Sequence, residues 1–350
     1  MERKSTVKNL ATRPILEVRN LSVRFRADEG TVHAVNGVDL VVPEGKSVGI
    51  VGESGCGKTV TAYSLTKLLP DNATVGGQIL YRAADDSTVD IASLPPDGSE
   101  IRRIRSQEIA MIFQEPMSSL SPVHTVLDQL SEALMLAHGV DRREARELCV
   151  EHLGRVGIPH PAARVDEYPF QFSGGMRQRV MIAMALARQP RILIADEPTT
   201  ALDVTLQAQV LNLIQSLQDE LRLSMILITH DLGVVAHMVD FICIMYLGKV
   251  VESGPLLEVF DNPLHPYTRG LLASIPKLKG RRGEKLVSIT GTVPSAYSIP
   301  EGCPFRARCE HAMDVCAVQA PLSTEVGSSH TVRCHLYQPQ EVDSGHHAAP

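Results

Sequence analysis

The chain has 350 residues, of which 44% are hydrophobic, and a formal net charge of −6. This length allows about two domains with a sizeable core, and the negative charge balance argues against a dedicated nucleic-acid-binding surface. No run of about 18 apolar residues occurs and the N-terminus has no apolar signal segment, so we expect a cytosolic chain that would serve a transporter only through separate membrane subunits.

The first part of the chain alternates short strands with turns. Residues 1–13 are predicted to form a flexible arm. The apolar pattern then predicts three short strands, a turn, and a buried strand that leads into a glycine-rich segment. These elements are Ile15 to Val18, Leu21 to Phe25, a turn at 26–31, His33 to Val42, and the buried strand Ser47 to Val51.

The glycine-rich segment from Gly52 to Thr59 reads GESGCGKT and fits the phosphate-loop pattern G-x-x-x-x-G-K-[ST]. The strand before it and a helical stretch from about Lys58 to Leu69 supply the strand-loop-helix context that the motif requires. Backbone N–H groups of the loop and the helix N-terminus would bind phosphates. The sequence therefore predicts binding of a nucleoside triphosphate, against the weak alternative of a chance glycine turn.

The side chains of this loop have distinct expected roles. Lys58 can reach the β- and γ-phosphates, and the Thr59 hydroxyl can bind Mg²⁺. We interpret Cys56 as a small residue, with sensitivity to oxidation as the weaker alternative. The loop residues expected to contact the nucleotide are Gly52, Ser54, Gly55, Cys56, Gly57, Lys58 and Thr59.

A helical region occupies the middle of the chain. A strand at about 107–113 leads into Gln114, and residues 124–156 have leucines at helical spacing. Ser173 then precedes a helix predicted from Gly174 to about Arg188, whose exposed N–H groups would form an anion site. Because a long helical stretch separates this site from the phosphate loop, one chain cannot easily bring the two together.

The strand Arg191 to Ala195 has the continuous apolar character of an interior parallel strand and ends in two acidic residues. Asp196 would hold Mg²⁺ through water. A carboxylate at Glu197 could polarise the water that attacks the γ-phosphate. The alternative for Glu197 is a solvated loop acid.

A helix at 207–221 and strands at 224–229 and 241–247 are predicted to complete the sheet, and the nucleotide-binding part would end near Asp261. His230 directly follows the strand at 224–229. If that strand lies beside the Asp196 strand, His230 faces the nucleotide. A lone histidine after a strand is otherwise usually structural.

The C-terminal region is rich in proline and glycine and contains four of the seven cysteines, Cys303, Cys309, Cys316 and Cys334, spaced C-x5-C-x6-C-x17-C. A cytosolic chain should not use them as disulfides. Four thiols in a small, weakly hydrophobic segment favour a structural metal site, because such a segment has little core to stabilise it. Structural zinc usually shows C-x2-4-C pairs, and four thiolates can also hold an iron–sulfur cluster. The spacing leaves zinc, a cluster and free thiols open.

The remaining segments are predicted to be structural or solvated. Cys149 and Cys243 lie in apolar contexts and are expected in the core. The basic residues at 277–285 lack aromatic neighbours and are interpreted as a solvated linker. The tail 341–350 is predicted to be disordered, and its adjacent histidines are weak evidence for a metal site.

The segment FSGGMRQR at 172–179 resembles the LSGGQ signature of the ATP-binding cassette (ABC) family, with Met176 in place of the glutamine. Six motifs occur in the family's order over most of residues 14–255. The resemblance implies the α/β fold of this family, with a RecA-like P-loop NTPase core, an antiparallel β-subdomain and a helical subdomain at about 115–190. It also implies a head-to-tail dimer in which the signature of one subunit closes on ATP held by the other.

The resemblance assigns further residues. Gln114 matches the Q-loop glutamine, a Mg²⁺ contact, and His230 the switch histidine that contacts the γ-phosphate. Phe25 lies where the family stacks an aromatic ring on adenine, although it could equally pack in the β-subdomain. Catalytic roles fall on Lys58, Gln114, Glu197 and His230, and further nucleotide contacts on Ser173, Gly174, Gly175, Asp196 and Asp203 of the D-loop.

The stretches 263–272 and 302–309 are similar to the C-terminal extension of oligopeptide and dipeptide importer ATPases, most of all to D-type subunits of dipeptide permeases. This resemblance implies a nucleotide-binding domain at 14–260 and an extension at 261–340, whose four cysteines hold a structural [4Fe–4S] cluster, with zinc as the alternative. It also implies hydrolysis of ATP with Mg²⁺ to energise peptide import.

The implied partners are a second, paralogous ATPase subunit, two transmembrane permease subunits and an extracytoplasmic peptide-binding protein, which would place the chain at the cytoplasmic face of the membrane. Nickel or another small solute is the alternative cargo. A soluble ABC ATPase of translation or repair is the less favoured class, because the chain has one phosphate loop and no long coiled coil.

Overall fold

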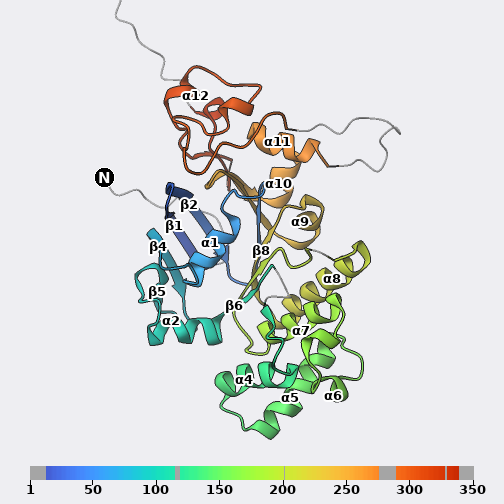
Figure 1. Cartoon of the computed structure of the whole chain (residues 1–350). Coiled ribbons are helices and arrows are strands. Elements are labelled where there is room, and N and C mark those ends of the chain that lie inside the picture. The colour runs from blue at the N-terminus through green and yellow to red at the C-terminus, as the bar shows by residue number, and fades with distance from the viewer. Residues whose placement is uncertain (1–12, 115–118, 201, 276–288, 328, 339–350) are drawn as a thin grey trace, which may run out of the picture.

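The computed structural model describes residues 13–114, 119–200, 202–275, 289–327 and 329–338. The predicted arm at 1–12, the basic segment at 277–285 and the tail at 341–350 lie outside these residues. None of the described helices is long and apolar enough to cross a membrane. The chain forms two sheets with helices around them, and the C-terminal segment lies at the opposite end from the helical lobe (Figure 1).

The smaller sheet is antiparallel and has the strand order β2-β1-β4-β5. We expected two strands at Ile15 to Val18 and Leu21 to Phe25, but the structure has one continuous strand. The chain bulges at Asn20, which has a φ of +50°, and the pairing register shifts there without ending the strand. The four strands are β1 (Pro14–Ala27), β2 (Gly30–Pro43), β4 (Ala73–Arg82) and β5 (Thr88–Asp90).

The larger sheet has the order β11-β12-β10-β9-β3-β8-β7-β6. Its parallel centre consists of apolar strands buried on both faces, as the sequence predicted. The strand before His230 pairs directly with the strand that ends in Asp196. The eight strands are β3 (Ser47–Val51), β6 (Ile109–Ile112), β7 (Ile192–Asp196), β8 (Ser224–Thr229), β9 (Phe241–Tyr246), β10 (Lys249–Pro255), β11 (Thr324–Val326) and β12 (His330–Val332).

Three of these strands extend the sheet beyond the expected last strand. β10 pairs antiparallel with β9, and the C-terminal hairpin β11–β12 pairs with β10 through Glu252 opposite Val332. The C-terminal segment is therefore joined to the larger sheet by backbone hydrogen bonds.

The helices that carry or position the site have identifiable ends. The helix after the phosphate loop stops at Leu65 rather than Leu69, because Lys67 turns into the left-handed region and donates to the carbonyl of Ala92. In the helical lobe, Gly139 ends one helix and Asp141 caps the next. The principal helices are α1 (Lys58–Leu65), α4 (Val126–His138), α5 (Arg142–Arg155), α7 (Gly174–Leu186), α8 (Val204–Leu221), α9 (Leu232–Met238), α10 (Leu256–Asp261) and α11 (Pro266–Ala273).

Short helices complete the fold: α2 (Ser99–Arg103), α6 (Pro161–Arg164) and α12 (Val315–Val318), with single turns at Ile91–Ser93, Ile104–Glu108, Pro169–Gln171, Arg306–Arg308 and His335–Tyr337. Cys149 and Cys243 are buried, as expected for core residues. Figure 1 shows α7 beside α4 and α5 in the lower lobe, away from α1.

Candidate active site

The phosphate loop folds tightly over its own lysine. Lys58 is buried, and its Nζ donates to the carbonyl oxygens of Gly52, at 2.8 Å, and Glu53, at 3.1 Å. Gly57 begins α1 with a φ of +101°, and a Cβ there would lie 2.3 Å from the Ala34 carbonyl oxygen. Only glycine fits this position, so the loop keeps the exposed backbone that an anion site needs.

The loop's other side chains differ in direction. Ser54 and Gly55 are exposed at the top of the loop. Cys56 is buried, and burial raises the pKa of its thiol. A buried, protonated thiol is a poor nucleophile, which supports the interpretation of Cys56 as a small packing residue over the oxidation-sensitive alternative.

Asp196 meets the loop at the end of β7. Its carboxylate is fully buried, and Oδ1 accepts a hydrogen bond from the Thr59 hydroxyl at 3.3 Å. Its Oδ2 has no hydrogen-bond partner among the described residues. Burial, and secondarily the charge of Glu197, raise the pKa of Asp196 to about 6. An orphaned buried carboxylate oxygen beside a hydroxyl is a donor set that suits Mg²⁺.

Three segments of the chain meet at Glu197: the one that ends in Gln114, the stretch from Glu197 to Thr200, and the one that carries His230. Oε2 of Glu197 accepts from the Gln114 amide at 3.2 Å and from the Thr200 hydroxyl at 2.9 Å, and its Oε1 lies 3.2 Å from Nδ1 of His230. The Glu197 side chain is 12% exposed, and its backbone has a φ of +44°. A non-glycine residue in the left-handed region at a buried carboxylate is typical of a functional site.

The structure therefore brings together the predicted residues Lys58, Thr59, Gln114, Asp196, Glu197 and His230. Thr200, which holds Glu197, was not predicted as a site residue. Its hydroxyl three residues after the acid is the signal that could have identified it.

The predicted signature lies in the helical lobe. Ser173 caps α7 by accepting from the Met176 N–H at 3.3 Å, and Ser173 and Gly174 are exposed while Gly175 is buried. Asp203 caps α8 in the same way by accepting from the Leu206 N–H at 2.9 Å. The α7 N-terminus is thus open to a ligand or partner outside this lobe.

Two contacts qualify other assignments. Gln178, buried in α7, donates to the Pro198 carbonyl at 2.6 Å and so ties the signature helix to the acidic end of β7. No motif in the sequence predicted this role. Phe25 is half-buried and packs against the core of the smaller sheet. Its adenine role stays a prediction beside this packing role.

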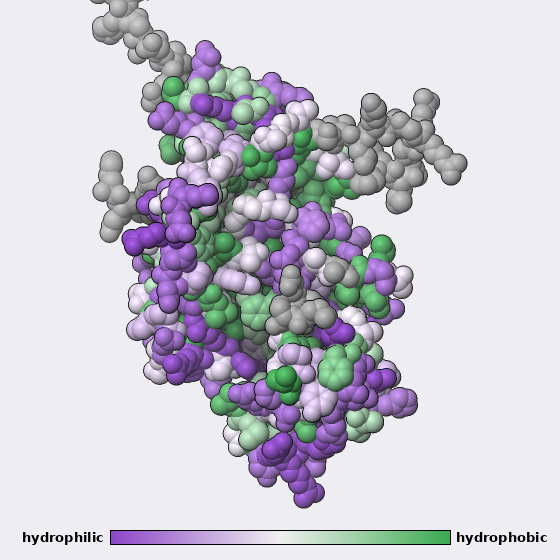
Figure 2. Space-filling view, in the orientation of Figure 1, coloured by the Kyte–Doolittle hydropathy of each residue, from purple (hydrophilic) through white to green (hydrophobic). Residues whose placement is uncertain are grey.

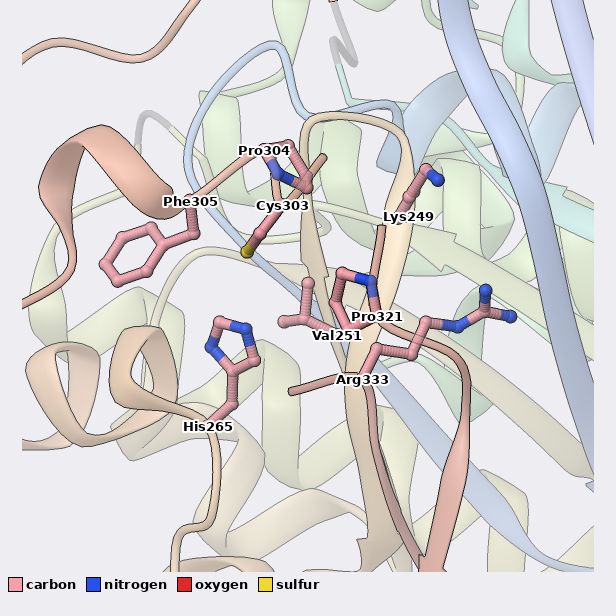
Figure 3. Close-up of a pocket in the computed structure, with 8 residues that line it drawn as sticks. All are labelled: Lys249, Val251, His265, Cys303, Pro304, Phe305, Pro321 and Arg333. Atoms are coloured by element: carbon pink, nitrogen blue, oxygen red, sulfur yellow. The ribbon is translucent and has the colours of Figure 1, made fainter. Parts of the chain in front are cut away.

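The four C-terminal cysteines share one small region. Cys303 and Cys316 are buried, and the backbone N–H of Cys303 donates to the Cys316 carbonyl at 2.8 Å. Burial, and then the neighbouring thiols, raise the pKa of Cys303 to about 11. Figure 3 shows the Cys303 sulfur in a small cavity between Phe305, His265 and Val251.

Burial raises the pKa of the Cys303, Cys309 and Cys334 thiols, and a backbone N–H two positions later acts against this rise by hydrogen bonding to the sulfur: Phe305 for Cys303, His311 for Cys309 and Leu336 for Cys334. Hydrogen bonds of this kind stabilise thiolates and tune thiolate-held clusters. Even so, no group of three or more Cys, His, Asp or Glu side chains within the described residues is arranged to hold a metal ion. Thiols are suitable ligands for a metal ion or a cluster, but these side chains are not arranged around a common metal position.

Comparison with known proteins gives consistent matches. Residues 35–200 match the ABC transporter family, and residues 251–316 match the C-terminal region of oligopeptide/dipeptide transporters. A putative peptide import ATP-binding protein of Brucella melitensis is 48% identical over 336 residues, covering 94% of this chain and 99% of the relative. Another from Brucella abortus is 47% identical over 334 residues, covering 95% and 98%.

Solved structures are similar in fold. The dimeric post-hydrolysis structure of an ATP-binding cassette bound to ADP and phosphate matches with a TM-score of 0.60 and 28% identity, over 69% of this chain and 98% of that chain. CbiO1 from Clostridium perfringens, part of an ABC transporter complex, matches with a TM-score of 0.58 and 29% identity, over 71% and 91%.

Proposed function

We propose roles for the site residues from the premise that this chain belongs to the peptide-import ATP-binding proteins of the ABC transporter family. The chain is an ABC-type ATPase that energises peptide import and works with ATP and Mg²⁺ in association with a membrane importer. The finer assignments below are our proposals.

The phosphate loop with Lys58 would bind the β- and γ-phosphates, and Thr59, Asp196 and Gln114 would hold Mg²⁺. When bound, Mg²⁺ neutralises phosphate charge. Glu197 would accept a proton from the attacking water while Thr200 and His230 hold its carboxylate. The observation that carries this proposal is the convergence of Gln114, Thr200 and His230 on Glu197 beside the loop-bound Asp196.

The test is Glu197→Gln in the full chain, with ATP binding and phosphate release measured separately. Glutamine keeps the shape of the side chain but cannot accept the proton, so binding should be retained and turnover should fall roughly 10²- to 10⁴-fold. Glu258→Gln, an exposed acid on α10, is the matched control. Normal turnover of the Glu197 variant would refute the base assignment.

A second ATPase subunit would complete the site. Ser173, Gly174, Gly175 and Asp203 would contact ATP bound by the partner, which we propose to be a paralogue of this chain. The exposed N-terminus of α7 supports this arrangement. Mixing this chain with its paralogue should raise ATP turnover above that of either alone, and a mixture no more active than the separate chains would contradict it.

The complex would contain two transmembrane permease subunits, and the helical lobe of this chain, at about 115–190, would dock on a membrane subunit. The surface of the lobe carries exposed apolar side chains, and Figure 2 shows hydrophobic residues among mostly hydrophilic ones there. The exposed apolar side chains include Val123, Leu136 and Phe170. The ring of Tyr168 is stacked on that of Phe170, with 5.5 Å between the ring centroids. Aromatic anchors of this kind are enriched at protein interfaces.

We further propose that the chain acts at the cytoplasmic face of the membrane as a peripheral subunit of a complex to which an extracytoplasmic binding protein delivers peptide. It would divide into a nucleotide-binding domain at 14–260 and an extension at 261–340. Within peptide import, we propose that the cargo is a dipeptide or oligopeptide rather than nickel or another small solute. Cells lacking the chain should then lose uptake of labelled dipeptide, and unchanged uptake would contradict this cargo.

The four C-terminal thiols would hold a structural [4Fe–4S] cluster, with zinc as the alternative. Support comes from four partly or fully buried thiols and the three N–H groups directed at their sulfurs. Iron, zinc and sulfide should be measured in anaerobically purified chain, with a visible spectrum. About four irons and four sulfides per chain are expected; zinc alone would reject the cluster, and neither metal would reject both.

A further inference from the structure

Glu53, the second residue of the phosphate loop, is held from three sides. Its carbonyl accepts from Lys58 Nζ at 3.1 Å, within the loop itself. Its backbone N–H donates to the Tyr267 hydroxyl at 3.0 Å, and its carboxylate accepts two hydrogen bonds from Arg308, at 2.7 and 2.9 Å. Two of these three restraints therefore come from the segment that follows residue 261.

The ion pair is built as a fixed contact. The Arg308 side chain is 4% exposed and that of Glu53 28%. The Arg308 guanidinium also donates to the Thr290 carbonyl at 3.1 Å and lies over the rings of Tyr246 and Phe305, at 5.8 and 5.9 Å. A two-pronged arginine–carboxylate pair with a buried guanidinium has one preferred geometry, unlike a flexible surface pair.

The second restraint belongs to a packed aromatic cluster. Tyr267 of α11 is fully buried, and its ring lies 4.8 Å from that of Tyr246 and 5.4 Å from that of Phe305. Phe305 and Arg308 sit in the short stretch between Cys303 and Cys309. Figure 3 shows Phe305 and Cys303 beside His265, on the side of the extension that packs on β10. The phosphate loop is thus held in place, through Glu53, by the part of the C-terminal extension that carries the thiols.

The charge of Arg308 indicates how this contact would affect ATP binding. An unpaired carboxylate at Glu53 would stand in the loop that receives the phosphates of ATP, and like charges close together disfavour binding. Arg308 cancels this charge and fixes the peptide whose carbonyl helps to hold Lys58. Both effects favour the arrangement that binds phosphate.

We propose that Arg308 is a positioning residue for the phosphate loop, so that nucleotide affinity depends on the C-terminal extension through the Arg308–Glu53 pair. This inference rests on the proposed role of the loop in binding ATP. Arg308 does not touch the nucleotide and acts through Glu53.

The test is a double-mutant cycle in the full-length chain, read as the Kd for ATP with Mg²⁺. Arg308→Met should weaken binding roughly tenfold, because it leaves a charged Glu53 unpaired. Glu53→Gln removes the charge, so the double variant should bind ATP more tightly than Arg308→Met alone. Arg306→Met, on the same short turn but half-buried and bonded to the Ala317 carbonyl rather than to Glu53, is the control and should bind as the parent chain does.

Hydrogen exchange separates positioning from a general loss of stability. Peptides covering residues 47–60 should exchange faster in Arg308→Met, while those covering the helical lobe keep the parent rate. Unchanged ATP affinity in a folded Arg308→Met chain, or a double variant as weak as the product of the two single effects, would overturn the inference. A parent chain that binds no ATP would instead overturn the proposed function.

Discussion

Replacement of Asp196 by asparagine should stabilise the metal-free, nucleotide-free chain while abolishing its magnesium-dependent turnover. The Asp196 carboxylate is fully buried with one orphaned oxygen, and its pKa is raised to about 6 from an ordinary 3.8. Each pKa unit corresponds to about 1.4 kcal/mol, so the ionised carboxylate costs the empty fold up to about 3 kcal/mol at neutral pH. Asparagine keeps the shape without the charge.

The sign of the pH dependence follows from the raised pKa. Well above pH 6 both folded and unfolded chains carry the ionised group and the full cost is present, whereas the cost falls as the pH drops from 6 toward 3.8 and vanishes only where both chains are protonated, well below 3.8. The thermal midpoint of Asp196→Asn should therefore exceed that of the parent at pH 7.5 in EDTA, with roughly half the gain at pH 5. No gain at pH 7.5, or a gain independent of pH, would refute the reasoning.

Two further substitutions test the supports of the site. Gly57→Ala should abolish ATP binding measured by titration, because its Cβ would lie 2.3 Å from the Ala34 carbonyl oxygen at a φ of +101°; retained affinity would show that the loop can rearrange. Glu252→Gln should lower the free energy of unfolding by about 3 kcal/mol. That carboxylate is buried and accepts from the N–H groups of Leu264 and His265 and from His330, all within 2.8 Å. An unchanged unfolding midpoint would contradict this anchoring role.

The features that the sequence predicted well are local. A phosphate loop is a run of eight residues whose glycines and lysine act within one turn of chain, and strand β3 and helix α1 flank it as expected. The pairing of β7 with β8 follows from two apolar strands, and it was enough to place His230 beside Glu197. In these cases the residues that make the structure are the residues that carry the pattern.

The features that were missed depend on contacts between distant residues. Nothing near Glu53 indicates that its partner is Arg308, 255 positions later. β4 was not predicted because Gly76 and Gly77 interrupt its apolar pattern, and its partner β1 supplies the pairing that overrides them. Likewise β12 is three residues long, and only its pairing with β10 on one side and β11 on the other makes it a strand.

The C-terminal hairpin also decides where the larger sheet ends. β12 covers the backbone groups of β10 over Glu252 and Ser253, and the outermost strand becomes β11, which is only three residues long. Short outer strands offer little template for pairing with another chain. A fragment cut after residue 260 would leave the backbone N–H and C=O groups of β10 unpaired at an open edge, so we expect the nucleotide-binding part made alone to self-associate through strands where the whole chain stays dispersed.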